Sequence, residues 1–157
     1  MTLPQPIWLI ARFLIRLYWR LARPLTVGVR GFVRNEAGEV LLVRHTYMRG
    51  WFLPGGGVSR GETMPDALIR ELDEEAGIIM LEPPRLFALY ANFREFKSDH
   101  VAMYLVGPGD FRHETRRSAE IAEYGFYPPD ALPEGTSPST RRRIAEVLEG
   151  LTPETLW

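Results

Sequence analysis

The segment from Gly56 to Ile78, which reads GGVSRGETMPDALIRELDEEAGI, restricts the possible folds more than any other part of the chain. Its second half has the apolar periodicity of an amphipathic helix, and a glycine-rich stretch precedes it. The expected apolar side of this helix consists of Leu68, Ile69, Leu72 and Ala76. The segment therefore predicts a glycine-rich loop that leads into a helix packed against a sheet.

Both ends of this helix carry residue types with known positional preferences. Thr63 is a good N-cap residue, and Asp66, three positions later, can complete a capping box. Pro65 suits the first helical turn, where its missing N–H has no cost. Gly77 directly follows the last apolar residue of the pattern and is expected to end the helix.

Three glutamates of the helix, Glu71, Glu74 and Glu75, occupy positions i, i+3 and i+4. Residues at this spacing share one face of a helix, so their carboxylates are expected side by side. Adjacent carboxylates repel one another unless a cation neutralises them, and carboxylate oxygens suit Mg²⁺ or Mn²⁺. The alternative is a solvated acidic face, which is the ordinary role of glutamates on helices.

The order and spacing of these residues resemble the Nudix box. Gly56 is followed after five residues by Glu62, and after seven more by Arg70-Glu71-Leu72. The pattern continues with Glu74-Glu75 and ends with Gly77-Ile78, so every fixed position of the box is filled. The resemblance implies a Nudix hydrolase with an α/β (α+β) fold, in which a mixed β-sheet lies between helices.

The resemblance also implies roles for individual residues of the box. The implied ligands of a Mg²⁺ or Mn²⁺ cofactor are Glu71, Glu74, Glu75 and the carbonyl of Gly56. Glu62 and Arg70 would form the scaffold of the box, with Arg70 holding Glu62 from the preceding loop or pairing with Glu74.

The base that activates the attacking water is not fixed by the resemblance, because the family takes it from different places. Glu71 or Glu75 could serve, and so could an acid on a later loop. Glu120, just before an expected strand, is the candidate on that loop, and Glu114 and Glu123 are its rivals. For Glu120, a solvated surface position is the alternative.

Substrate choice depends on residues outside the box. Cationic side chains can donate charge-assisted hydrogen bonds to phosphates, and aromatic rings can stack on a base. The candidates for substrate contact are Arg44, Arg49, Trp51 and Arg94. An ordinary surface or core position is the alternative for each of them, and the sequence does not identify the substrate.

Outside the box, the sequence predicts several strands and one further helix. The expected strands are residues 25–34, 39–45, 51–53, 85–93, 100–106 and 121–127, and the expected helix is 139–148. The first two strands are expected to form a hairpin around a turn at 35–38. Strands and helices in mixed order, without regular βαβ alternation, favour an α+β or mixed α/β sandwich.

Residues 7–21, IWLIARFLIRLYWRL, predict an extra N-terminal amphipathic helix. We therefore expect a division into this helix, residues 1–23, and a Nudix hydrolase domain, residues 24–157. Arginines interrupt the apolar run, which argues against a transmembrane span and against a secretory signal. The helix can pack on its own domain or on a partner subunit, or it can make weak contact with an anionic membrane surface.

Composition adds a few exclusions. The chain has 157 residues, the size of a single compact domain, and the absence of cysteine excludes disulfides and thiol nucleophiles. A formal net charge of −1 gives no reason to expect nucleic acid as a partner. We expect a cytoplasmic protein with a small-molecule nucleotide substrate, and a homodimer stays open.

The function that the resemblance to the Nudix family implies is cleavage of a pyrophosphate bond in a nucleoside diphosphate linked to another moiety. A divalent metal and an activated water would carry out this reaction. Two alternatives remain at this point. One is a Nudix module that binds a ligand or acts as a scaffold without turnover, and the other is a protein attached to a membrane surface by its N-terminal helix.

Overall fold

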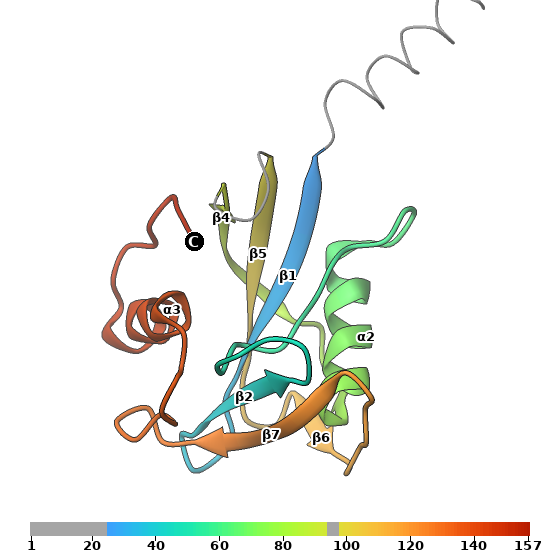
Figure 1. The fold of residues 1–157 in the computed structure, drawn as a ribbon, viewed down its shortest axis with the longest axis vertical. Coiled ribbons are helices and arrows are strands. Elements are labelled where there is room, and N and C mark those ends of the chain that lie inside the picture. Colours follow the sequence, from blue (N-terminus) through green and yellow to red (C-terminus); the bar gives the residue numbers. More distant parts are fainter. Residues whose placement is uncertain (1–24, 94–97) are drawn as a thin grey trace, which may run out of the picture.

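A central three-stranded sheet lies between two helices in the computed structural model, which describes residues 25–93 and 98–157 (Figure 1). The strand order is β1-β5-β4, where β1 is Thr26–Val33, β5 is Asp99–Val106 and β4 is Arg85–Ala91. β1 runs parallel to β5, whereas β4 pairs with β5 in the antiparallel sense. The predicted mixed sheet between helices is therefore confirmed.

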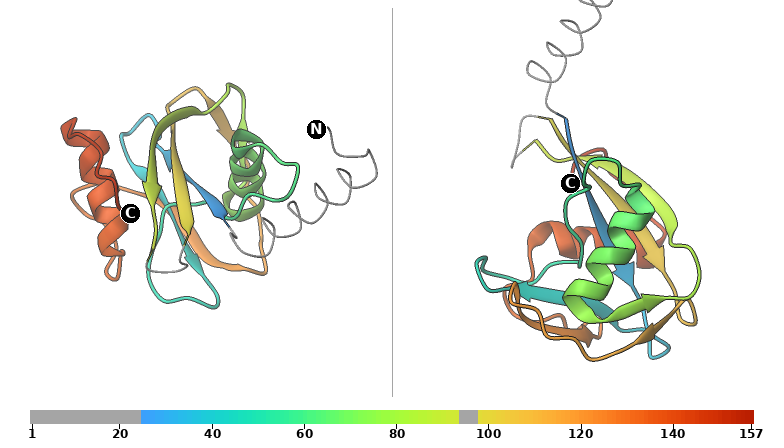
Figure 2. Two further views of the ribbon diagram at one scale, coloured as in Figure 1. Left: turned by 90° about the horizontal axis from the view of Figure 1, so that it is seen from above. Right: turned by 90° about the vertical axis from the view of Figure 1, so that its right-hand side faces the viewer.

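The two helices cover opposite faces of this sheet, as the views of Figure 2 show. They are α2, Met64–Ala76, and α3, Pro138–Glu149. On the α2 face, Leu68 and Leu72 of the helix pack with Val29 of β1 in one buried cluster. On the α3 face, Ile144 packs in a second cluster with residues that include Phe32, Tyr90 and Met103. The sheet thus has two separate apolar interfaces.

Two strand pairs complete the fold. β2, Val40–His45, pairs with β7, Ile121–Tyr127, and β3, Ile78–Met80, pairs with β6, Phe111–His113, both in the antiparallel sense. The short strands β3 and β6 were not predicted, because three residues are too few to show a period.

The predicted hairpin between the first two strands is wrong, although the turn that joins them is present. The N–H of Gly38 donates to the carbonyl of Asn35, which closes the turn. Beyond one isolated bridge between Arg34 and Val40, however, β1 and β2 do not pair. One edge of β1 is occupied by β5. The other edge is occupied by residues 54–58, called the glycine-rich loop from here on.

Other local expectations were met only in part. The predicted strand 51–53 is reduced to isolated bridges, in which Phe52 pairs with Val43 and Trp51 with Thr136. Ile69, expected on the buried side of the helix, is 36% exposed. The helix caps follow the prediction, since Thr63 accepts from the backbone N–H of Asp66 and Gly77 adopts a left-handed conformation.

The expected N-terminal helix, residues 7–21, lies outside the described residues, and so does its expected contact with a membrane surface. Arg94, a candidate for substrate contact, is also outside them. Within the two described ranges, no helix is long and apolar enough to cross a membrane.

Candidate active site

The glycine-rich loop lies flat against the edge of β1. The N–H of Val29 donates to the carbonyl of Gly56 over 2.8 Å, and the N–H of Gly31 donates to the carbonyl of Pro54 over 2.9 Å. Gly55 has a φ of 138°, and a Cβ atom there would overlap the backbone carbonyl of Val29. Glycine is therefore required at this position, both by conformation and by the close approach of two backbones.

Arg70 fastens the loop to helix α2. Its guanidinium donates to Glu62 over 2.8 Å, to Glu71 over 2.7 Å and to the carbonyl of Gly57 over 3.2 Å. The pKa of Glu62 is lowered to about 2, first by the hydrogen bond from Arg70 and then by the N–H of Ser59. Glu62 and Arg70, to which the resemblance assigns the scaffold of the box, are thus in direct contact.

Glu71 packs directly on the loop. A Cβ atom added to Gly56 would overlap the carboxylate of Glu71, so only glycine leaves room for this side chain. The side chain of Glu71 is 16% exposed, whereas that of Glu74, further along the same face, is 61% exposed. Glu74 lies 3.5 Å from the guanidinium of Arg70.

Glu75 is the most deeply buried acid of the box, with 7% of its surface exposed. Its carboxylate accepts a hydrogen bond of 2.8 Å from the N–H of Gly55 and lies 3.8 Å from Nε2 of His45. Burial raises the pKa of Glu75 to about 7, and the nearby charges of Glu71 and Glu120 act in the same direction. A carboxyl group in this environment gains from a cation that neutralises it.

The donor set fits a hard divalent cation, because buried and neighbouring carboxylates are the ligands that such ions prefer. Among the described residues, however, no three acids or histidines are already arranged around a common point. Glu71 points one oxygen to Arg70, and Glu75 points one to Gly55. The carbonyl of Gly56 accepts from Val29, so one of its lone pairs is already used.

The later acids that the sequence proposes as bases differ in their surroundings. Glu123 forms an exposed ion pair of 2.8 Å with Arg44, and Glu114 pairs with Arg112. Glu120 is exposed, and its charge contributes to the raised pKa of Glu75. The backbone N–H of Glu114 donates to the carbonyl of Gly77 at the end of α2 over 2.8 Å, but of the three acids only Glu120 is among the charges that raise the pKa of Glu75.

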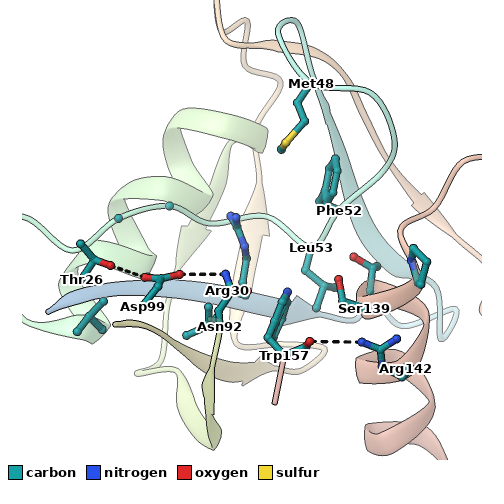
Figure 3. A pocket seen from close by; sticks show the side chains of 17 residues that line it. Thr26, Arg30, Met48, Phe52, Leu53, Asn92, Asp99, Ser139, Arg142 and Trp157 are labelled. Carbon is teal, nitrogen blue, oxygen red and sulfur yellow. Dashed lines mark hydrogen bonds between the residues drawn. The ribbon is translucent and has the colours of Figure 1, made fainter. Parts of the chain in front are cut away.

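A cavity of about 460 Å³ opens beside the glycine-rich loop, on the α3 side of the sheet (Figure 3). Gly56 and Gly57 line it on one side, and Arg142 of α3 lines it on another. Arg30 of β1 also lines the cavity and donates to the carbonyl of Gly55. Its positive charge opposes the rise of the Glu75 pKa, so the cavity wall and the acid site are electrostatically linked.

Comparison with known proteins agrees with this geometry. A family model described as NUDIX domain matches residues 24–148, which include the loop, helix α2 and all strands of the fold. This protein belongs to the Nudix family.

Solved Nudix structures resemble this chain over most of its length. The MutT Nudix hydrolase from Burkholderia pseudomallei is 27% identical, with a TM-score of 0.65, and the match covers 83% of this chain and 100% of that one. The MutT protein from Methanosarcina mazei is 26% identical, with a TM-score of 0.58 and coverage of 83% and 96%. An ADP-ribose pyrophosphatase from Streptococcus suis, 20% identical with a TM-score of 0.62 and coverage of 85% and 97%, shares the fold.

Among curated proteins, the RNA pyrophosphohydrolases of Pseudomonas putida and Pseudomonas aeruginosa are 48% identical to this Nudix protein over 52 residues. The matched stretch is 33% of the chain and 31% of each relative. The chain therefore spans about a third of the length of the curated relatives it matches.

Three of the four predicted substrate contacts of this Nudix domain are described, and none of them lines the cavity. Trp51 is 7% exposed and packs in the core with Tyr127. Arg44 is engaged with Glu123, and Arg49 is exposed outside the cavity lining. The fold instead brings neighbouring residues of the sequence, such as Phe52, to the cavity.

Arg30 was missed by the sequence analysis, although a signal for it exists. It follows Val29 in a strand whose side chains alternate between two faces, and Val29 packs on the α2 side. Arg30 therefore points to the α3 side, where the cavity lies.

Proposed function

We propose that this Nudix domain hydrolyses a pyrophosphate bond in a nucleoside diphosphate linked to another moiety, with Mg²⁺ or Mn²⁺ as cofactor. The observation that carries the proposal is the pair of carboxylates of Glu71 and Glu75, both held against the glycine-rich loop. The loop that these acids contact also forms a wall of the cavity. The acids and the cavity that would hold the substrate are therefore in contact with the same loop.

The ligands of the cation in this proposal are Glu71, Glu74 and Glu75, with the Gly56 carbonyl as a further donor. When bound, a divalent cation neutralises charge on phosphate oxygens and lowers the pKa of an attacking water. Arg70 holds Glu71 in place from one side, and the N–H of Gly55 orients Glu75 from the other. Such positioning by neighbouring groups is what keeps ligands in a productive arrangement.

Glu120 is the proposed base that removes a proton from the attacking water. Support comes from its exposure and from the effect of its charge on the pKa of Glu75. A solvent-accessible carboxylate near the acids of the box can be reached by a water molecule and accept its proton. Glu75 is the alternative base, because its carboxylate lies against the glycine-rich loop that lines the cavity.

Arg30 is the proposed phosphate contact. It combines a position on the cavity wall with proximity to the glycine-rich loop, which suits a group that faces phosphates near the acids. The cavity volume of about 460 Å³ lies in the range that holds small-molecule ligands. A nucleotide with its phosphates toward Arg30 and its base deeper in the cavity is the arrangement that we favour.

The test is a panel of candidate substrates incubated with Mg²⁺, Mn²⁺ or EDTA, followed by measurement of released phosphate and nucleotide. The names of two similar proteins suggest ADP-ribose and RNA with a pyrophosphate bond as members, and nucleoside triphosphates are added to them. Nucleotide sugars and dinucleoside polyphosphates complete the panel. Metal-dependent turnover of one class is expected, whereas binding of nucleotide and metal without any turnover would support the binding-module alternative.

A further inference from the structure

Residues 151–157 are joined to the end of strand β4 by backbone hydrogen bonds. The N–H of Ala91 donates to the carbonyl of Thr155 over 2.9 Å, and the N–H of Trp157 donates to the carbonyl of Ala91 over 3.0 Å. Leu156 and Ala91 form a parallel bridge. The segment therefore extends the central sheet, and its position is fixed relative to the cavity wall.

Arg143 of helix α3 holds the same segment by its side chain, which is fully buried. The guanidinium donates to the carbonyl of Leu156 over 2.8 Å and to Glu154 over 3.1 Å, and it lies 2.8 Å from the carboxylate of Glu146. A buried cation is strongly destabilising unless it is paired, so these contacts must form together. An apolar side chain in place of Arg143 would be enough to cover the core. The polar contacts of Arg143 in addition fix one geometry for residues 154–157.

Aromatic contacts fix the ring of Trp157 within this arrangement. The ring lies edge-on to Tyr90, with centroids 5.3 Å apart and an interplanar angle of 76°. The guanidinium carbon of Arg143 lies 5.7 Å from the Trp157 ring centroid and 4.5 Å from that of Tyr90. Trp157 remains partly exposed, and it lines the cavity (Figure 3).

The polar residues of the neighbouring cavity wall already bond to one another. Asp99 accepts from the hydroxyl of Thr26 over 2.7 Å and from the amide of Asn92 over 2.9 Å. These groups are thus satisfied within the protein. Aromatic surface of Trp157 and Phe52 on the cavity lining is then available for a planar group, because stacking needs no particular pattern of donors and acceptors.

We propose that Trp157 is a specificity-determining residue whose ring stacks on the base of a nucleotide in the cavity, and that Arg143 is the positioning residue that holds it there. This inference rests on the proposed function, since it assigns the base-binding part of the same cavity. Because the contact is a stacking contact, it selects for a substrate that carries a planar base and discriminates little between bases.

The experiment is equilibrium binding to the full chain in the presence of Ca²⁺, with ADP, GDP and inorganic pyrophosphate as probes. Trp157→Leu keeps an apolar side chain against Tyr90 but removes the ring. It should weaken ADP and GDP at least about fivefold and leave pyrophosphate within about twofold. Trp157→Phe should restore most of the affinity for ADP. Leu151→Ala, on the same segment but outside the cavity lining, is the matched control and should change neither.

Unchanged ADP affinity in Trp157→Leu would overturn the proposal, and so would equal weakening of ADP and pyrophosphate, which indicates a structural role alone. Binding does not require turnover. If binding depends on the base but no substrate of the panel is hydrolysed, the proposed function is contradicted and the role of Trp157 stands. If a substrate is hydrolysed but binding does not depend on the base, the role of Trp157 is contradicted and the proposed function stands.

A double variant tests whether Arg143 acts through Trp157. Arg143→Lys keeps the positive charge but loses the planar guanidinium group with its several donors. It should weaken the binding of ADP and leave the binding of pyrophosphate unchanged. Combined with Trp157→Leu, it should add no further loss for ADP, because both changes remove the same contact. Additive losses would overturn the positioning role of Arg143.

Discussion

The carboxylate of Glu75 accepts a hydrogen bond of 2.8 Å from the backbone N–H of Gly55, twenty residues earlier in the chain. This contact joins the helix that carries the box acids to the loop that lines the cavity. Burial of the carboxylate in this packing is the main cause of its raised pKa, and the hydrogen bond from Gly55 partly offsets the rise. The charge state of Glu75 is therefore coupled to the packing of the loop.

Replacement of Glu75 by glutamine should reduce the rate of metal-dependent hydrolysis by about tenfold to hundredfold, because an amide is a poorer metal ligand than a carboxylate. The fold should persist, since glutamine has the same shape and its oxygen can still accept from the N–H of Gly55. Steady-state rates over a range of Mg²⁺ concentrations, with circular dichroism on the same samples, would check this expectation. Full activity in the variant would show that Glu75 is not a ligand.

The stability of the metal-free protein should fall between pH 5 and pH 8. The pKa of Glu75 is about 7 in the folded protein and 4.5 in its ordinary state, so the folded protein binds this proton more tightly than the unfolded chain. The corresponding stabilisation is complete below pH 4.5 and is lost as the pH rises through 7, with an upper bound of about 3 kcal/mol.

Urea denaturation in EDTA at both pH values measures this change, and Glu75→Gln is the matched control because its side chain cannot ionise. Burial lowers the pKa of His45, which has the opposite effect on stability at low pH, but both proteins share that contribution. The wild-type protein should therefore lose more stability than the variant between pH 5 and pH 8. Equal losses in the two proteins would contradict a raised pKa at Glu75.

Helix α2 could be predicted from sequence because its signals are local. Thr63 and Gly77 are its caps, and the apolar period gives its extent. The rotation of helix α2 about its own axis, which decides which side chains face the sheet, could not be predicted. The buried side includes Ala67 and Glu75 and leaves Ile69 partly exposed, since the sheet and the loop together cover the helix. This rotation buries Glu75, and its unusual pKa follows from tertiary packing that no helical period contains.

The cavity was the part of the site least accessible to sequence reasoning. Its wall joins Arg30 of β1, Arg142 of α3 and Trp157, three residues that are far apart in the chain. No motif connects them, and their proximity depends on the parallel pairing of β1 with β5 and on the contact between Trp157 and Ala91. Trp51 was a reasonable candidate by residue type, but alternation places it in the core and Phe52 on the cavity.

Replacement of Arg70 by lysine should lower activity even though the charge is retained. The guanidinium donates at once to Glu62, Glu71 and the carbonyl of Gly57, and a single ammonium group cannot match this fork. We expect looser binding of Mn²⁺, by about tenfold, because Glu71 loses its positioning contact. Titration of Mn²⁺ by electron paramagnetic resonance measures this affinity without any need for turnover, and an unchanged value would contradict the positioning role of Arg70.

The two adjacent glycines of the loop, Gly56 and Gly57, should differ in their tolerance of substitution by alanine. A methyl group at Gly56 would overlap the carboxylate of Glu71, so Gly56→Ala must displace this side chain or the loop. At Gly57, in contrast, an added Cβ atom would meet no other atom within 4 Å. Gly56→Ala should therefore weaken Mn²⁺ binding and destabilise the fold by about 1–3 kcal/mol, whereas Gly57→Ala should change stability by less than about 0.5 kcal/mol.

The matched pair separates crowding at Glu71 from a general effect of alanine in the loop. Urea denaturation gives the change in stability, and Mn²⁺ titration gives the change in metal affinity of the same proteins. If both variants lose affinity equally, the loop as a whole rather than the contact between Gly56 and Glu71 controls the site. If only Gly56→Ala loses affinity, the position of the Glu71 carboxylate is the quantity that matters, because it is the group that the added methyl would displace.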